Sequence, residues 1–421
     1  MPIRFHARRC LAGVFLSLIP AGAFAAQPLT LSALEARLRE APPPMVAAAS
    51  ARARALEEDA AVSRTLPPPQ LLLGVEDMPV AGNSAWQLPP GGEGMATVGV
   101  MQMFPSGVRR ELRSRQTLLF ADAATAQRDA ELRASLRELR LAWIDGWLAQ
   151  QGLALHERLA VERERLGEAR DAAYRAGKVT LAEREQSKLA LALLHDRRRE
   201  LRQQTGAAKQ QLARWTGEAL PEDTMLAAPD LAPPPEASEL LAALDTHPDL
   251  IGIRREQEAR QTGAELARAG ARPDWRLEAR YGLRGDMPDT ASVMLGVDMP
   301  LLSASRRRHE VASALLAGEE GAAQREDTQR RLHADIRTLS QKHQALLERL
   351  SALDADVLPL ALRASDAALA GYRSGRDDFA TVIEARLAAL EIEDMRLGLQ
   401  AELQRTRAEL LYFAPVAASG E

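Results

Sequence analysis

Cysteine is almost absent from this chain of 421 residues. The single cysteine, Cys10, lies in an N-terminal segment that resembles a secretory signal, so the mature chain should contain no thiol. A chain without thiols forms no disulfide and no cysteine-ligated metal site. The sequence also lacks a Gly-x-Ser-x-Gly motif, a His-Glu-x-x-His motif and a phosphate-binding loop. We therefore expect no enzyme, no catalytic residue, no cofactor and no bound metal.

The first 25 residues have the three parts of a cleaved signal peptide. Arg4, Arg8 and Arg9 form a basic start, residues 11–19 are apolar, and Ala23-Phe24-Ala25 is a small-x-small cleavage motif. The apolar run is too short to span a bilayer, which disfavours an uncleaved anchor. The sequence thus predicts export.

Long apolar runs and an excess of positive charge are also missing. The net charge is −4, and removal of the signal would take away three arginines and no acid. An acidic exported chain has no electrostatic attraction for nucleic acid. After the signal there is no run of about 18 apolar residues, so no membrane-spanning helix is expected. If the chain crosses a membrane, it must do so with β-strands.

What the sequence does contain is an internal duplication. Tyr174-Arg-Ala-Gly177-Lys178 and Tyr372-Arg-Ser-Gly375-Arg376 lie 198 residues apart, and 98–101 and 295–298 lie 197 apart. Repeats decide architecture and are therefore read first. We predict four segments: a signal peptide at 1–25, a first repeat at 26–228, a Pro-rich connection at 229–236 and a second repeat at 237–421. The two repeats should interweave into one domain.

Each repeat begins with a helical arm and ends with a long helical hairpin. The arms are expected at 31–64 and 237–271, interrupted near Pro44 and Pro248, because proline breaks a continuing helix. The hairpins should combine 108–175 with 180–216, and 305–372 with 378–412. A helix of about 65 residues is about 100 Å long. The fold class is therefore mainly α with a small β part.

A heptad seam follows the outgoing helix of the second hairpin. Its apolar positions recur at alternating spacings of four and three: Leu332, Ile336, Leu339, His343, Leu346, Leu350, Leu353, Val357 and Leu360. This pattern predicts coiled-coil packing along the whole run. His343 occupies a seam position, so we interpret it as a packed residue and not as a ligand.

Two short segments of alternating character precede each hairpin. In the clearest segment, Trp275, Leu277 and Tyr281 share one face of a strand, and the opposite face carries Arg276, Glu278, Arg280 and Arg284. The segments are close to the ~9–11 residues with which a tilted strand crosses a bilayer. The pattern alone also fits the edge of a soluble sandwich. Four strands cannot close a barrel, so a membrane sheet would need several chains.

Together, the signal, the duplicated unit, its two strands and hairpins that end in Tyr-x-x-Gly resemble the TolC-type outer-membrane efflux factors. The resemblance implies a homotrimer with a twelve-stranded β-barrel in outer-membrane lipid and an α-helical tunnel in the periplasm of a Gram-negative bacterium. It implies a passive exit duct that an inner-membrane pump reaches through a periplasmic adaptor protein. The charged face 276–284 would line the barrel lumen, and Trp275, Leu277 and Tyr281 would meet lipid.

Two scaffold segments, 66–80 and 98–110, resemble the cobalt–zinc–cadmium branch of that family. Members of this branch serve heavy-metal pumps of the resistance–nodulation–division type, which makes such a pump the expected partner. Export of drugs, or type I protein secretion, is the alternative within the same class. A soluble periplasmic coiled-coil adaptor or scaffold is the alternative from another class.

The resemblance also carries over individual residues near the hairpin ends. The positions that would dock the adaptor are Tyr174, Gly177, Lys178, Leu181, Tyr372, Gly375, Arg376 and Phe379. In TolC-type members, two acidic positions beyond the second tip narrow the periplasmic entrance. The matching positions are Thr381 and Glu384, and the first repeat places Glu183 and Gln186 there. We therefore treat these four as candidates for an entrance gate.

Overall fold

The computed structural model describes residues 29–83, 85–86, 94–221, 223–285, 287–298 and 304–415. The expected signal peptide at 1–25 lies outside the described residues, as does the end of the second repeat beyond Pro415. Within the described part, no helix has the length and the apolar composition that crossing a membrane requires.

Helices and strands follow the predicted order in both repeats. The first repeat contains α1 (Leu31–Glu40), α2 (Pro44–Arg64), β1 (Gln70–Glu76), β2 (Met95–Phe104), α3 (Gly107–Arg175) and α4 (Leu181–Thr216). The second contains α5 (Ala237–Ala243), a short 3-10 turn (Leu244–Thr246), α6 (Pro248–Ala269), β3 (Trp275–Leu283), β4 (Thr290–Val297), α7 (Ala304–Ala352), a π-helical turn η3 (Leu353–Val357), α8 (Leu358–Arg373) and α9 (Phe379–Phe413). The fold class and the expected hairpins are confirmed.

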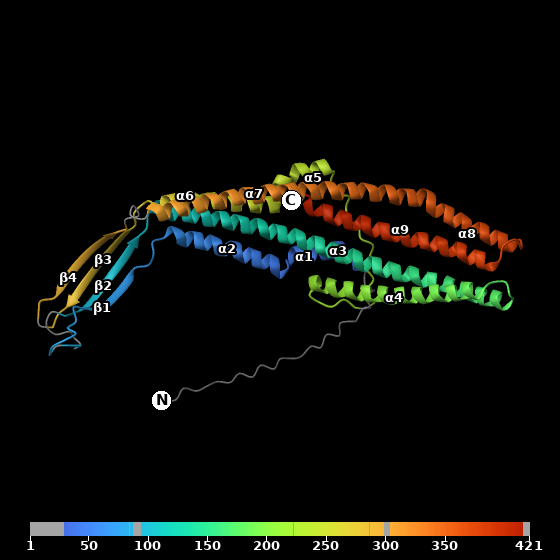
Figure 1. The fold of residues 1–421 in the computed structure, drawn as a ribbon, viewed down its shortest axis with the longest axis horizontal. Helices are drawn as coiled ribbons and strands as arrows, with labels where there is room; N and C mark the ends of the chain where they lie inside the picture. Colours follow the sequence, from blue (N-terminus) through green and yellow to red (C-terminus); the bar gives the residue numbers. More distant parts are fainter. Residues whose placement is uncertain are drawn as a thin grey trace, which may run out of the picture.

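The described chain is a long rod with the sheet at one end and two helical tips at the other (Figure 1). Helix α3 has 69 residues, so it runs about 100 Å from the base of the sheet to the first tip. Pro44 and Pro248 occupy the first positions of α2 and α6, where the missing N–H of proline costs no hydrogen bond. The predicted interruptions of the two arms are therefore confirmed.

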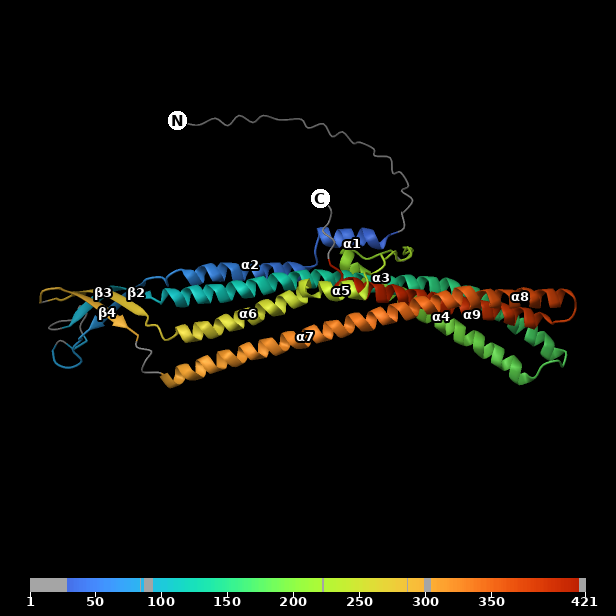
Figure 2. The ribbon, with the colours of Figure 1, turned by 90° about the horizontal axis from the view of Figure 1, so that it is seen from above.

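The helices and strands form a wall one layer thick. Neighbouring elements follow a similar order at three levels: in the sheet, in the helices beside it and in the helices near the tips. The sheet runs β1-β2-β3-β4. Beside it the helices run α2-α3-α6-α7, each packed against the next (Figure 2). Toward the tips, α3 packs on both α4 and α9, and α9 packs on α8. At every level the first repeat supplies one edge of the wall and the second repeat supplies the other.

The four strands are antiparallel, and their register separates two faces. Val98 faces Leu73 on β1 and Tyr281 on β3, which places these side chains on one face. That face is apolar and exposed in all four strands, at Leu71, Leu73, Val75, Val98, Val100, Phe104, Trp275, Leu277, Tyr281, Leu283, Val293, Leu295 and Val297. The opposite face carries the charged residues of β3. The alternation predicted for β3 is confirmed.

Buried side chains hold the layer together in three clusters. The largest surrounds Trp143, which is fully buried in the middle of α3 and donates from its indole Nε1 to the Ala227 carbonyl at 3.0 Å. The second lies around Ile336 of α7 and Phe413 of α9. The third joins Leu159 of α3 to Ile383 of α9 near the tips, so the two hairpins of one chain pack on each other.

The predicted heptad seam is correct only as far as Leu353. Leu332, Ile336, Leu346 and Leu353 are buried, but Val357 and Leu360 are exposed. The cause is the π-helical turn Leu353–Val357, which precedes Pro359 and inserts one extra residue into the helix. Beyond this turn, the buried and half-buried positions of the helix are shifted by one residue. They include Leu358, Ala361, Ser365 and Ala368. The prediction of a continuous seam through Leu360 is therefore wrong.

Candidate functional site: the helical tips and the charged face of the sheet

Both hairpins turn through a glycine in the left-handed region. Gly177 has φ 68° and Gly375 has φ 75°, which an L residue adopts only with strain. Around Gly177, the amide of Lys178 donates to the Ala173 carbonyl at 2.9 Å. Around Gly375, the amide of Arg376 donates to the Gly371 carbonyl at 2.9 Å. These are the two positions at which the sequence predicts the tips.

Each returning helix begins with a threonine and an acidic residue that are three positions apart. The threonine comes first at α4, and the acidic residue comes first at α9. At α4, Thr180 is the N-cap and its hydroxyl accepts from the Glu183 amide, while a Glu183 carboxylate oxygen accepts from the Thr180 amide at 2.7 Å. At α9, Asp378 is the N-cap and its carboxylate accepts from the amide and the hydroxyl of Thr381 at 2.9 and 2.8 Å. Each cap satisfies amides that the first helical turn leaves unpaired.

Two of the four gate candidates, Glu183 and Thr381, take part in these caps. The hydrogen bonds from Thr180 lower the pKa of the Glu183 carboxyl, because they favour its charged form. The hydrogen bonds from Thr381 lower the pKa of Asp378 in the same way. In this structure, Glu183 and Thr381 therefore serve the starts of their helices.

Glu384 makes one of the ion pairs that link the two hairpins, and it lies near the tips. Its carboxylate accepts from Nη2 of Arg170 on α3 at 2.5 Å. Arg170 also reaches the Glu183 carbonyl at 3.4 Å, so it touches the beginning of α4 as well. The fourth candidate, Gln186, is exposed, and none of the described hydrogen bonds involves its side chain.

Within the first hairpin, the two helices are joined by an ion pair. Arg184 of α4 donates to Asp171 of α3 at 2.6 Å, and its guanidinium lies 5.3 Å from the centre of the Tyr174 ring. Their hydrogen bond raises the pKa of Arg184 and lowers that of Asp171. Sequence reasoning missed Arg170, Asp171 and Arg184. A signal was available, since the duplication places Ala368, Leu369 and Val382 at the equivalent positions.

Near its tip, the second hairpin is joined by apolar contacts instead. The Tyr372 and Phe379 rings lie 5.7 Å apart, between α8 and the start of α9. Val382, the counterpart of Arg184, is fully buried. At both tips, several predicted docking residues remain exposed: Tyr174, Leu181, Tyr372 and Phe379.

The charged face of the sheet is partly neutralised by ion pairs. Arg280 pairs with Glu278 on its own strand and with Glu76 on β1. Arg276 lies across Gly296 of β4. Its guanidinium Nε would be only 3.2 Å from a Cβ at this position, so a larger residue would crowd it. Arg284 follows the end of β3, and its amide donates to Asp289 at 3.1 Å. Arg276, Glu278 and Arg280 thus share one side of β3, whereas Arg284 belongs to the turn.

No cluster of three or more possible metal ligands occurs among the described residues. His343 lies in the seam beside Arg407, whose Nε is 3.4 Å from His343 Nε2. Partial burial and this arginine lower the pKa of His343.

Comparisons with known proteins agree with this architecture. Residues 240–413 match the family model described as outer membrane efflux protein. The solved outer-membrane channel OprN has a TM-score of 0.74 and 18% identity, over 91% of this chain and 89% of that one. The outer membrane protein VceC of Vibrio cholerae has 0.73 and 18%, over 91% and 95%.

The open state of the MtrE outer membrane channel of Neisseria gonorrhoeae has a TM-score of 0.74 and 16% identity, over 91% and 88% of the two chains. No curated protein matches the sequence. Identities this low show a shared fold. The described chain therefore has the fold of solved outer-membrane channels, and its residues 240–413 are similar to the outer membrane efflux protein family.

Proposed function

We propose that three copies of this chain form the outer-membrane exit duct of a tripartite efflux system. The observation that supports this most is the pair of unpartnered edges at every level of the wall. A single copy is a curved layer of four elements, and within the described residues each level leaves one edge from each repeat without a neighbour. Three copies joined edge to edge would close the layer into a tube.

The sheet gives the strongest reason to expect that several copies close into a tube. Its apolar face is exposed on all four strands, which suits contact with lipid. In the part of the chain that the structure describes, strands β1 and β4 each leave one edge without a partner strand. Unpaired backbone groups are not tolerated in lipid, so the edges must pair with those of other copies. Three sheets of four strands give a twelve-stranded barrel with no free edge.

The helical edges near the tips carry matching apolar side chains. Leu189 and Leu193 are exposed on α4, and Leu360 and Leu362 are exposed on α8. Leu193 lies 16 residues from Gly177 and Leu360 lies 15 from Gly375, so the two are at similar heights above their tips. Packing of α4 against α8 of the next copy would bury both pairs.

The same account assigns roles to the tips. The exposed residues around Gly177 and Gly375 would dock the periplasmic adaptor, and the pump would act through that adaptor. The Arg170–Glu384 ion pair would hold the hairpins of one chain together at a narrow entrance. Separation of the helix pairs would open it. The protein would be a passive conduit and not an enzyme, with its barrel in the outer membrane and its helices in the periplasm.

A heavy-metal pump of the resistance–nodulation–division type is the partner that we propose. The support is the resemblance of segments 66–80 and 98–110 to the cobalt–zinc–cadmium branch. A strain without this gene should become sensitive to zinc, cobalt, cadmium or copper. If it becomes sensitive to drugs alone, the heavy-metal assignment is wrong and the duct serves a drug pump.

Cell fractionation tests the duct itself. The protein should appear in outer membranes as a trimer that dissociates on heating, and the purified trimer should conduct ions in planar bilayers. Recovery of a soluble protein without detergent would contradict the proposal and favour a periplasmic adaptor or scaffold.

A further inference from the structure

A pocket between α3, α6 and α7 collects three arginines near the base of the sheet. Its volume is about 450 Å³, and its polar lining is Arg109, Arg113, Gln116, Arg260 and Glu310. In the wall, α6 lies between α3 and α7 (Figure 2). Side chains from α3 and α7 can meet over α6 only on the side toward which the wall curves. The pocket therefore opens on the concave face.

Small residues keep this pocket open. Gly263, Ala267 and Gly270 of α6 form its floor, and Ala314 and Ala317 line it from α7. A Cβ at Gly263 would come within 2.8 Å of Gln116 Nε2, so even one added methyl group would require Gln116 to move. The space between the arginines thus depends on the absence of larger side chains.

Positive charge in the pocket exceeds negative charge. Arg109 pairs with Asp274, and Arg260 donates to the Gln324 amide oxygen at 2.9 Å and lies 3.9 Å from a Glu320 carboxylate oxygen. Arg113 has no ion pair with any residue in the described part of the chain. The carboxylate among the lining residues is Glu310, and it accepts from Arg306 at 2.8 Å. A guanidinium therefore remains available for a ligand.

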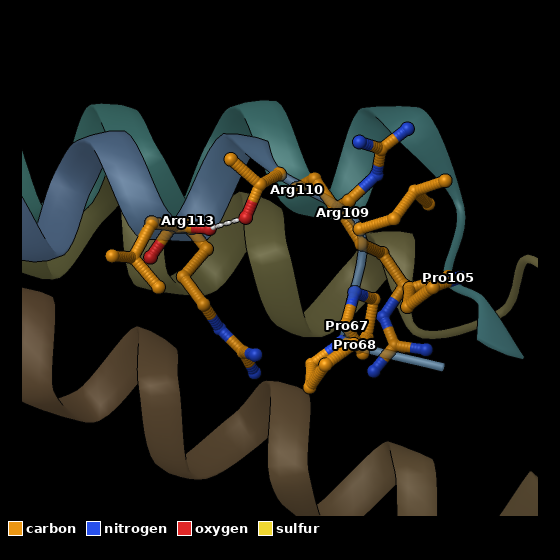
Figure 3. A pocket seen from close by; sticks show the side chains of 10 residues that line it. Pro67, Pro68, Pro105, Arg109, Arg110 and Arg113 are labelled. Atoms are coloured by element: carbon orange, nitrogen blue, oxygen red, sulfur yellow. Dashed lines mark hydrogen bonds between the residues drawn. The ribbon is translucent and has the colours of Figure 1, made fainter. Parts of the chain in front are cut away.

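A second cavity adjoins the first across the same side chains. Arg109 and Arg113 also border a cleft of about 280 Å³ whose other side includes Pro67, Pro68 and Pro105 (Figure 3). Proline fixes the backbone dihedral φ, so this border is stiff. Arg109 and Arg113 consequently border both cavities where the helices meet the sheet.

We infer that the arginine pocket binds polyvalent oxyanions and gives the duct a preference for anions. Guanidinium groups recognise phosphate and carboxylate through paired N–H···O hydrogen bonds. The inference rests on the proposed function, because only a closed duct forces solutes past the pocket. Three copies would place three pockets at one level, and charges on low-dielectric walls focus the field on passing ions. Metal cargo would pass this level more readily as an anionic complex than as bare divalent cations.

Conductance of the reconstituted trimer tests this inference. Under a KCl gradient, the sign of the reversal potential should show that chloride is more permeant than potassium. This preference should weaken between 0.1 and 1 M KCl, because the Debye length falls from ~10 to ~3 Å. Sodium triphosphate should reduce the current. Arg113→Gln should raise the half-blocking triphosphate concentration about tenfold, the low end of the range for field focusing.

Two further variants separate the pocket from general charge. Arg115→Gln removes the same charge two positions along α3, which places it about 200° around the helix from Arg113. It should change neither block nor selectivity. Ala314→Leu fills the pocket without removing charge, so block should weaken while the reversal potential is kept. Equal block in the wild type and in Arg113→Gln, or an equal effect of Arg115→Gln, would overturn the inference.

Failure of the duct is distinguishable from failure of the pocket. If no version of the protein conducts, the proposed function fails, and binding of triphosphate to the detergent-solubilised trimer is then measured by calorimetry. Binding that Arg113→Gln weakens would support the pocket even so. Absence of binding in the wild type would reject it.

Discussion

The two halves of this chain are alike in the sheet and different at the tips. Each half gives two strands to the same sheet and keeps apolar residues on the same face. At the tips, the first hairpin is joined by the Asp171–Arg184 ion pair and the second by the rings of Tyr372 and Phe379. Moreover, α3 is continuous for 69 residues, whereas the π-helical turn at 353–357 separates α7 from α8.

The difference shows which parts of a duplicated unit stay free to diverge. A sheet that must pair edge to edge requires the same strand geometry from both halves. The tips require only a glycine turn and a capped helix. The second hairpin, with its interrupted helix and apolar contacts, is the half that we expect to move when the entrance opens.

The largest effect should come from charges on the apolar face of the sheet. Val98 and Leu295 are equivalent positions in the duplication, so Val98→Arg and Leu295→Arg should each cost ~2–4 kcal/mol near the middle of a bilayer. The control is Met294→Arg on the opposite face, where Glu278 is the cross-strand neighbour. The yield of heat-dissociable trimer in outer membranes measures the result. Equal losses in all three variants would mean that the two faces are not distinguished by lipid.

Breaking the Arg170–Glu384 ion pair between the hairpins should have the next largest effect. Glu384→Gln removes the ion pair with Arg170, and an exposed pair contributes ~0.2–1 kcal/mol. With about 0.5 kcal/mol from each of three copies, the ratio of open to closed entrances should rise about tenfold, as measured by conductance in planar bilayers.

The matched control for this link is Gln186→Ala at the equivalent place in the first repeat. It should leave conductance unchanged. The exchange Arg170→Glu with Glu384→Arg should restore the closed entrance. An increase of the same size in Gln186→Ala, or no recovery in the exchanged pair, would reject Glu384 as the link.

A smaller effect should follow from giving the first hairpin the residues of the second. Asp171→Leu with Arg184→Val removes an exposed ion pair, and such pairs contribute little to stability because solvent screens them. Hydrogen exchange should become faster in the first turns of α4 and stay the same in α9. The reverse substitution, Val382→Arg, should destabilise the second hairpin far more, because it would bury an arginine without a partner. Similar hydrogen-exchange rates in the first-hairpin variant and in the Val382 variant would show that the two hairpins are interchangeable.

The smallest effect should be the response of the helix caps to pH. The pKa values of Glu183 and Asp378 are lowered in the folded protein, so their stabilisation is present above their unfolded pKa values near 4. It should be lost as the pH falls through the folded values. The amides of Thr180 and Thr381, which donate to these carboxylates, should therefore lose protection from exchange together below about pH 4. Acceleration at one tip alone would show that the exchanged caps are not equivalent.

Much of this architecture follows from periodicity. The repeat offset located both glycine turns, and alternation at 275–284 separated the two faces of β3. The capping pattern Thr180-x-x-Glu183 was also readable from sequence, since a threonine followed three residues later by glutamate marks a helix start. Our interpretation of Glu183 as a gate residue overlooked this signal.

Two features depended on three-dimensional packing. Arg170 and Glu384 are 214 residues apart, and no local pattern relates them. The π-helical turn shifts the seam by a single residue, which a strict heptad count cannot show, although Pro359 marks the place. Interactions across the two repeats and small changes in helical register were therefore outside the reach of the sequence.

Cross-linking between the exposed edges tests the closed trimer most directly. The mature chain is expected to contain no cysteine, so Leu193→Cys and Leu360→Cys would supply its only thiols. A short bis-maleimide added to outer membranes should give covalent dimers and trimers, because α4 of one copy lies against α8 of the next. Controls with either cysteine alone should give no trimer. Cross-links confined to single chains would contradict the account.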